Sequence, residues 1–549
     1  MNNQEKKLCT GQLVSPNHCL DNPNCVIPMG IERVMAAFLL AFPCAVCIAE
    51  IFRVFLYYSI VVRGIFVILP ILVVGMLLSF GLVVFAINKL ELTSNRGMNI
   101  AIVVLICWSA FIFRLQAGCV LNGYPQNDFY NNWMCIVEPE THQSTLRVYY
   151  YAVYAATVRA WMSFIGVWQI NAVFLFNAAV TSVIPGLLYL ATKKITNSNF
   201  IALICAVLYA FFPSMIMYTV CVAGENVSQF FMASLFTCLV YAWGYGPAEW
   251  KKRWFLLILA AVCGGLLNLY KPILSIILVV IIAQEVVYNV VPAIAEILMQ
   301  GHYRDSLKRI GASLLCVICF TTIGKGIHTM ALSAVNSYFG TETDVGYYGV
   351  DNFTEIAYFG LIKEGNGVWN ANALEKRAAL LTNSDSKEQA HEKMMAELVN
   401  QIQESPTDFL RLLHRKMLIS WSDEWAYGYY ATVSENGISE VESTPHGYLA
   451  VMVMPRMYLG MLYWFCAIQL MNSLLKRQKR ENRAEGTLMM FFGLFTLVFL
   501  VLEAHNRYRS TFMPLLCILS AGGIGRFFDF AIKNNKRFMK EIAFGRTRK

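Results

Sequence analysis

The chain has 549 residues, of which 57% are hydrophobic and only 14% are charged. A soluble domain carries about a quarter charged residues, so this composition excludes an ordinary soluble enzyme and predicts a polytopic membrane protein. The net charge of +9 does not indicate nucleic acid, because the lysines and arginines concentrate in short loops and at the C-terminus. Residues 1–32 are polar, and we expect no cleavable signal peptide there.

We predict an all-α fold with about twelve transmembrane helices, since each apolar run is about twenty residues long and can cross a bilayer. The first run carries Glu50 and Arg53, which can pair on one helix face, so an interfacial helix is the alternative there. The predicted spans are residues 35–60, 65–88, 98–118, 168–192, 199–219, 226–245, 254–270, 273–298, 310–335, 448–473, 487–504 and 511–530.

Basic clusters recur in alternate loops, and twelve spans place all of them, with both termini, on the cytoplasmic side. The other loops are then extracytoplasmic, and two of them are large. The resulting parts are a cytoplasmic tail with two extra N-terminal spans (1–97), a transmembrane core (98–335) with a first outer loop (119–167), an extracytoplasmic loop domain (336–447), C-terminal spans (448–530) and a basic cytoplasmic tail (531–549).

Within the first outer loop, the aromatic stretch Arg147–Trp168 favours a membrane-surface helix, and a disulfide between Cys119 and Cys135 is left open. In the second, the pattern predicts helices over Ala373–Gln403 and Thr407–Ser420. No internal repeat is visible, which weighs against the inverted-repeat plan of many transporters.

Polar residues collect at the predicted outer ends of the spans, where a charge costs a few kcal/mol and usually marks a site or an ion pair. Four separate connections contribute them: Asp128 within Tyr124–Trp133, Gly224-Glu225-Asn226, Tyr270-Lys271-Pro272, and the segment Glu503–Arg509.

The chemistry of these groups is complementary. Asp128 and Glu225 are acids that can accept a proton or hold a cation, whereas Lys271 and Arg507 can bind a phosphate. Tyr508 adds a hydroxyl and a ring. A carboxylate base beside a phosphate clamp suits the attack of an acceptor hydroxyl on the anomeric carbon of a lipid-phosphate sugar.

Structural explanations compete at each position. Asp128 could cap a surface helix or pair with Arg147, and Glu225 could cap the following span. Lys271 could extend to the membrane interface, and the arginines of 507–509 could bind lipid headgroups. His505 fits a supporting role better than a catalytic one. Cys9, Cys19, Cys25 and His18 have irregular spacing, which argues against a zinc site.

Together these motifs resemble the GT-C class of polytopic glycosyltransferases, most closely its bacterial branch related to protein O-mannosyltransferases and aminoarabinose transferases. The likeness covers residues 98–530. It rests on Tyr124-Pro125-Gln126-Asn127-Asp128-Phe129, which is similar to a Pro-x-x-Asp-Phe motif, on Gly224-Glu225-Asn226, on Glu503 with Arg507-Tyr508 and Pro514, and on Pro406–Asp423 with Lys416 and Trp421.

The resemblance implies a multi-pass protein of the cell membrane with an extracytoplasmic site, a polyprenyl-phosphate sugar donor and inversion at the anomeric carbon. The acceptor would be a protein, a wall polymer or a lipid. Asp128 would be the general base, with Glu225 beside it, and Arg507 would hold the lipid phosphate. Lys271, Glu503, His505 and Tyr508 would line the substrate site.

The sequence departs from the class at Phe129, where many members have a second adjacent acid. Glu225, Glu138 and Glu140 are candidates for that acid, no metal ligand is assigned, and a divalent cation is left open. Two other classes remain: a flippase or transporter of lipid-linked sugar, which would need charge near the bilayer midplane, and a non-catalytic polytopic scaffold with 336–447 as its binding module.

Overall fold

The computed structural model describes residues 96–121, 123–244, 249–300, 303–341, 353–368, 370–422, 425–438, 447, 449–475 and 483–546. This part of the chain is helical and contains no β-strand, which confirms the predicted all-α class. The predicted spans 35–60 and 65–88 lie outside the described residues.

Eight helical segments in the described part are long and apolar enough to cross a membrane, and each coincides with a predicted span. The chain is therefore a multi-pass membrane protein. The eight are α5 (Arg96–Leu121), α9–α10 (Ile170–Ser182 and Ile184–Thr196), α14 (Trp250–Tyr270), α15–η4–α16 (Leu274–Glu285, Val286–Val290 and Val291–Gln300), α17 (Tyr303–Phe339), η7–α25 (Leu449–Val453 and Met454–Leu475), α26 (Arg483–Val501) and η8–α27 (Asn506–Phe512 and Met513–Arg546).

Two predicted spans have a different form. The run 199–219 is broken into α11 (Asn199–Ala210) and α12 (Pro213–Tyr218), because Pro213 cannot continue the preceding helix and instead occupies the first position of the next. The run 226–245 forms α13 (Glu225–Trp243), whose first turns bury Asn226, Ser228 and Gln229. Its polar beginning packs inside the protein rather than against lipid.

The break after α11 is held by Arg114 of α5, a buried charge that the sequence pattern did not indicate. Its guanidinium donates to the carbonyls of Ala210 (3.0 Å) and Tyr209 (3.3 Å), and to Ala110 in its own helix (3.2 Å). The last carbonyls of a helix lack intrahelical partners. Arg114 supplies those partners and links α5 to the discontinuous span.

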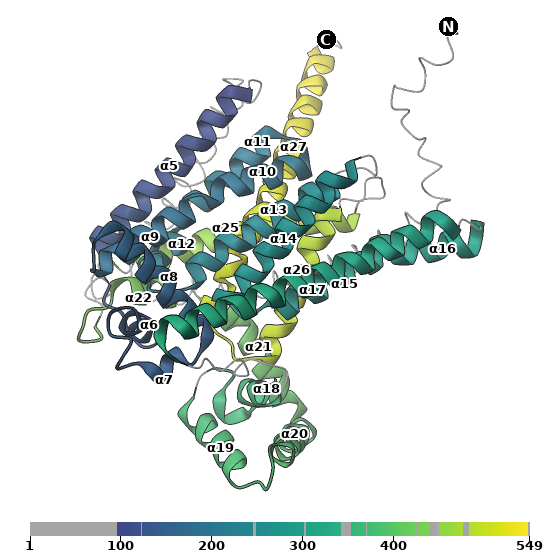
Figure 1. Cartoon of the computed structure of the whole chain (residues 1–549). Coiled ribbons are helices and arrows are strands. Elements are labelled where there is room, and N and C mark those ends of the chain that lie inside the picture. The colour runs from purple at the N-terminus through teal and green to yellow at the C-terminus, as the bar shows by residue number, and fades with distance from the viewer. Residues whose placement is uncertain are drawn as a thin grey trace.

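The two large loops fold into helices at one end of the bundle, while the tip of α27 lies at the other end (Figure 1). The first loop forms α6 (Asp128–Val137), α7 (Gln143–Leu146) and α8 (Tyr149–Ile165). The second forms α18 (Phe353–Leu361), η6 (Lys363–Gly365), α19 (Ala371–Thr382), α20 (Lys387–Glu404), α21 (Pro406–Trp421) and α22 (Trp425–Thr432).

The structure bears on one expectation and one open question about the first loop. Helix α8 packs against the protein, with Tyr154, Val158 and Met162 buried, so it is not a helix lying only on the membrane surface. Cys119 and Cys135 are both free thiols. Cys119 is exposed near the end of α5, whereas Cys135 is fully buried on the inner face of α6, and the two side chains have different surroundings.

Replacing Arg114 by leucine should lower the stability of the protein, because the carbonyls of Tyr209 and Ala210 lose their buried donors, and an orphaned buried group costs about 1–3 kcal/mol. The thermal midpoint of purified protein in detergent measures the loss. Val104→Ala on the exposed face of the same helix is the control and should leave the midpoint nearly unchanged. Equal midpoints for the two variants would contradict the capping role.

Candidate functional site

Asp128 is fixed at the start of α6 by contacts with the second large loop. The N–H of Tyr124 donates to the Val433 carbonyl (2.8 Å), immediately after α22. At Gly123 a Cβ atom would lie 2.6 Å from the backbone of Ala431, so only glycine permits this approach. Asn127 has a positive φ of 52°, which asparagine tolerates better than most residues. Two distant loops therefore determine where the Asp128 carboxylate lies.

Phe129, which stands where a second acid was expected, anchors this turn. Its ring is buried and meets the rings of Tyr430 (centroids 4.7 Å apart) and Tyr218 (6.2 Å) edge to face. The guanidinium carbon of Arg507 lies 5.5 Å from the centroid of the same ring. Phe129 thus supports both Asp128 and the cation beside it.

Two ion pairs bring all four connections together. Asp128 pairs with Arg507, and Glu225 pairs with Lys271 at 3.1 Å. The Arg507, Glu225 and Lys271 side chains are 14–16% exposed, whereas that of Asp128 is 39% exposed. Electrostatic attraction also links Arg507 to Glu225 and Lys271 to Asp128. The cluster is charge-balanced, and Asp128 is its most accessible member.

The ring of Tyr508 lies between the two cations. The Lys271 ammonium nitrogen is 4.2 Å from its centroid and the Arg507 guanidinium carbon is 5.5 Å from it. Cation–π attraction is stronger where water is displaced, as it is here. The Tyr508 hydroxyl donates to Glu503 at 3.5 Å, so Glu503 orients this ring from within the same connection.

His505 accepts a hydrogen bond on Nδ1 from the Arg507 N–H (3.2 Å), which places its own proton on Nε2. Burial and the nearby Arg507 and Lys271 charges hold the pKa of His505 well below its usual range. The ring is therefore neutral at ordinary pH, and it accepts from the backbone that carries Arg507.

The turn before Glu225 is built on two buried asparagines. The Asn177 amide donates to the carbonyls of Thr219 and Cys221, both at 3.0 Å. The Asn226 amide donates to the Tyr218 carbonyl at 3.1 Å. Glu225 then stands in the first turn of α13, where a negative charge is favoured by the helix dipole.

Helix α21 fixes the segment that carries Arg507 from the side of the loop domain. The fully buried Lys416 amine donates to the carbonyls of Gly360 (2.7 Å) and Val501 (3.3 Å). One helical turn later, the Ser420 carbonyl accepts from Arg509 at 2.9 Å. Burial lowers the pKa of Lys416 to about 7, and a neutral amine retains two N–H donors for its two carbonyl partners.

Sequence reasoning missed two tyrosines of the site. Tyr218 is buried, and its hydroxyl has no hydrogen-bond partner within the described residues, although it lies in the electrostatic field of Arg507 and Glu225. The Tyr427 hydroxyl donates to the Asn506 carbonyl (2.9 Å). An aromatic residue at the end of an apolar run has many structural explanations, so the sequence alone carried no signal that distinguished these two.

The other residues considered as a second acid or as the partner of Asp128 lie outside the cluster. Glu138 and Glu140 are exposed beyond the far end of α6, about 15 Å along that helix from Asp128, so Glu225 is the second acid of the cluster. Asp128 pairs with Arg507 and not with Arg147. Among the residues that the structure describes, no group of three or more His, Cys, Asp or Glu is placed to hold a metal ion.

Residues 154–322 match a family model described as dolichyl-phosphate-mannose-protein mannosyltransferase. This match confirms the predicted resemblance to GT-C glycosyltransferases. No curated protein sequence matches the chain.

Two crystal structures of the Archaeoglobus fulgidus oligosaccharyltransferase overlap with the fold. The form tethered to an acceptor peptide is 13% identical with a TM-score of 0.43, covering 79% of this chain and 50% of its own. The apo form is 15% identical with a TM-score of 0.40, covering 80% and 52%. The chain thus spans about half the length of these structures.

The contribution of Lys416 to stability should depend on pH. Its folded pKa of about 7 lies below the unfolded value of about 10.4, so between these values the unfolded chain binds more protons and stability rises with pH. In Lys416→Met this dependence disappears. The difference in thermal midpoint, wild type minus variant, should therefore increase as the pH rises from about 7 to about 10.

The matched control is Lys363→Met, at an exposed lysine of the same loop domain, whose difference from wild type should stay constant over that range. If the difference in thermal midpoint between wild type and Lys416→Met is equally independent of pH, Lys416 is protonated in the folded protein over this whole pH range.

Proposed function

We propose that this protein is an integral membrane glycosyltransferase. It would transfer a sugar from a polyprenyl-phosphate donor to an acceptor hydroxyl on the extracytoplasmic side, with inversion at the anomeric carbon. The observation that carries the proposal is the cluster of Asp128, Glu225, Lys271 and Arg507, drawn from four connections to one end of the helical bundle.

The matched family's description names a lipid phosphate as carrier, mannose as the sugar and protein as the acceptor. We carry over only the lipid-phosphate sugar donor. The acceptor would be a protein, a wall polymer or a lipid. The isoprenoid tail would remain in the bilayer while the phosphate and sugar reach the polar cluster at its edge.

The two cations suit an anionic lipid phosphate. Arg507 presents a planar fork that matches phosphate oxygens, and Lys271 adds a compact charge close by. Without substrate, the carboxylates of Asp128 and Glu225 neutralise these cations. A phosphate would compete with Asp128 for Arg507 and thereby free the more exposed acid for chemistry.

In the transfer step, Asp128 would accept the proton of the acceptor hydroxyl as its oxygen attacks the anomeric carbon. The bond from that carbon to the phosphate oxygen breaks, and its electron pair stays on the departing lipid phosphate. Arg507 and Lys271 would stabilise that charge, an effect of roughly 3–4 kcal/mol in comparable sites. A positioned base contributes about a hundredfold or more in rate.

Asp128→Asn should reduce sugar transfer by at least about a hundredfold, because the amide cannot accept the proton. Transfer of radiolabelled sugar from polyprenyl-phosphate donors by purified protein measures the loss. Glu138→Gln, at an exposed acid of the same loop, should retain full activity. Undiminished transfer by folded Asp128→Asn would remove this residue from the mechanism.

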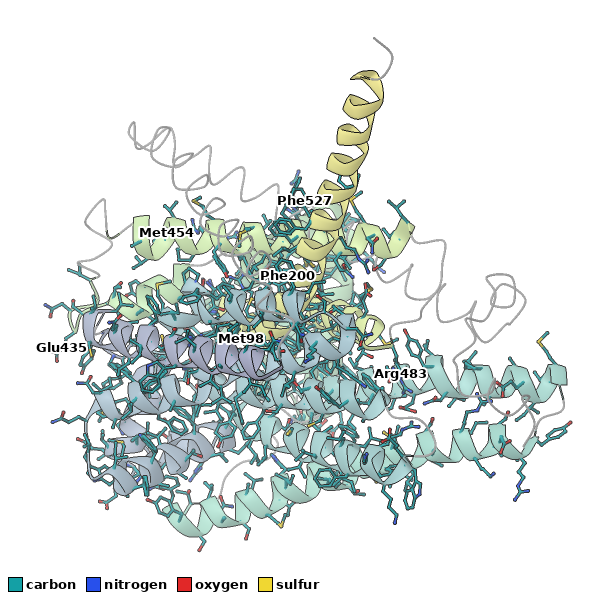
Figure 2. All side chains as sticks on the ribbon, turned by 90° about the horizontal axis from the view of Figure 1, so that it is seen from above. Met98, Phe200, Glu435, Met454, Arg483 and Phe527 are labelled. Atoms are coloured by element: carbon teal, nitrogen blue, oxygen red, sulfur yellow. The ribbon has the colours of Figure 1, made fainter. Side chains whose placement is uncertain are left out.

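The site should face the outside of the cell. Glu435 follows α22, and Lys308 lies near the start of α17; Figure 1 shows α22 on the opposite side of the bundle from the connection between α16 and α17. Figure 2 labels Glu435 far from Arg483, which begins α26. In intact cells, a membrane-impermeant maleimide should label Glu435→Cys but not Lys308→Cys, with the unsubstituted chain as the background control. Labelling of Lys308→Cys alone would show that the membrane orientation is the reverse of the one proposed.

A further inference from the structure

The loop domain contains a polar cleft that the transfer step does not use. It has a volume of about 620 Å³ and opens between η6, the C-terminal half of α20 and the N-terminal half of α21. The domain has its own small core, which includes Tyr358, Phe359, Met394 and Leu398. The cleft is therefore supported by packed helices, and α18, α19 and α20 form a separate body at the end of the bundle (Figure 1).

The seven charged residues that line the cleft are of both signs, and five of them are in ion pairs. Asp408 pairs with Arg411 at 3.0 Å and with Lys363 at 3.7 Å. Glu364 and Glu397 both pair with Lys376, which lies just outside the lining. The cleft thus presents no strong field of one sign, which argues against a highly charged ligand.

What remains for a ligand is a set of neutral and mixed polar groups beside one ring. Asn366 and Asn400 offer amides that both donate and accept, Glu404 offers a carboxylate, and Arg415 offers a guanidinium of the opposite charge. Within the described part of the chain, the Asn400 and Glu404 side chains make no hydrogen bond or ion pair with other residues. Phe409 lies half-buried in the wall and provides an apolar face.

We propose that this cleft binds a neutral carbohydrate chain. Sugar hydroxyls both donate and accept, so they match amides and carboxylates without requiring a net charge, while the apolar face of a sugar ring packs on an aromatic side chain. An extended peptide would need a strand edge or a series of apolar pockets. The described residues contain no strand, and Phe409 and Leu412 are the apolar lining residues.

The cleft is connected to the transfer site through one rigid element. Leu412 and Arg415 of α21 line the cleft, and Lys416 on the same helix donates to the Val501 carbonyl. Ser420, about 12 Å along the helix from Leu412, holds Arg509. A glycan several units long, held in the cleft, would therefore be fixed relative to Arg507.

This placement indicates that the bound carbohydrate is the acceptor of the transfer reaction. The assignment as acceptor rests on the proposed function, whereas carbohydrate binding in the cleft does not. The acceptor glycan would carry the reacting hydroxyl, and the cleft would hold units remote from it. Binding remote from the chemistry lowers KM for a long acceptor and leaves a short acceptor unaffected.

The test measures binding of fluorescently labelled neutral oligosaccharides, linear hexose and N-acetylhexosamine chains, to the full chain in lipid nanodiscs by fluorescence anisotropy. Phe409→Ala and Asn400→Ala should each weaken binding about tenfold or more. The matched controls are Leu410→Ala and Gln403→Ala, neighbours on the same two helices that do not line the cleft, and both should bind as the wild type does.

Binding is measured without transfer, so its result is independent of whether the protein is a transferase. Absence of oligosaccharide binding, or equal losses in the cleft and control variants, would overturn the proposal. Binding of a serine- and threonine-rich peptide in place of the oligosaccharides would also overturn it and assign the cleft to a polypeptide. If transfer is observed, Phe409→Ala should raise KM for a long glycan acceptor and leave kcat unchanged.

Discussion

The Asp128–Arg507 ion pair joins residues 379 positions apart, and the architecture of this end of the bundle serves to bring them together. Arg507 would be unstable alone where it lies. Arg507 is 14% exposed beside helices that cross a membrane, and a charge in such a place needs a partner. Asp128 provides one, and Glu225 adds a second attraction. The pairing requires the first large loop, α22 and the segment before α27 to meet in a fixed arrangement.

That arrangement is enforced mainly by backbone carbonyls and their donors. Tyr427 and Lys416 of the loop domain donate to the carbonyls of Asn506 and Val501. In the opposite direction, Arg509 donates to the Ser420 carbonyl, so three side chains join the 501–509 segment to the loop domain. Such bonds are insensitive to the identity of the residue that offers the carbonyl. The acids and cations of the cluster are thus positioned by residues that take no part in its charge balance.

The sequence was sufficient to predict the helical class, the eight apolar spans and the residues of the charged cluster, because span length and the cost of charge near lipid are local properties. The partners of those residues were not predictable. Arg147 lies in the same loop as Asp128, but the fold packs the chain around Gly123 against α22 and pairs Asp128 with Arg507. The same limit applies to Lys416, whose two acceptors belong to α18 and to the end of α26.

Phe129 illustrates how a departure from a family pattern acquires a physical explanation. A second carboxylate at this position would sit beside Asp128 and would have to be desolvated between Tyr218 and Tyr430. The phenyl ring instead fills that space and presents its face toward Arg507. Glu225 then supplies the second negative charge from another connection, paired with Lys271 at 3.1 Å. The cluster therefore contains two acids and two cations, with the acids on separate connections. Of the two acids, Asp128 is the more exposed and can meet an incoming hydroxyl.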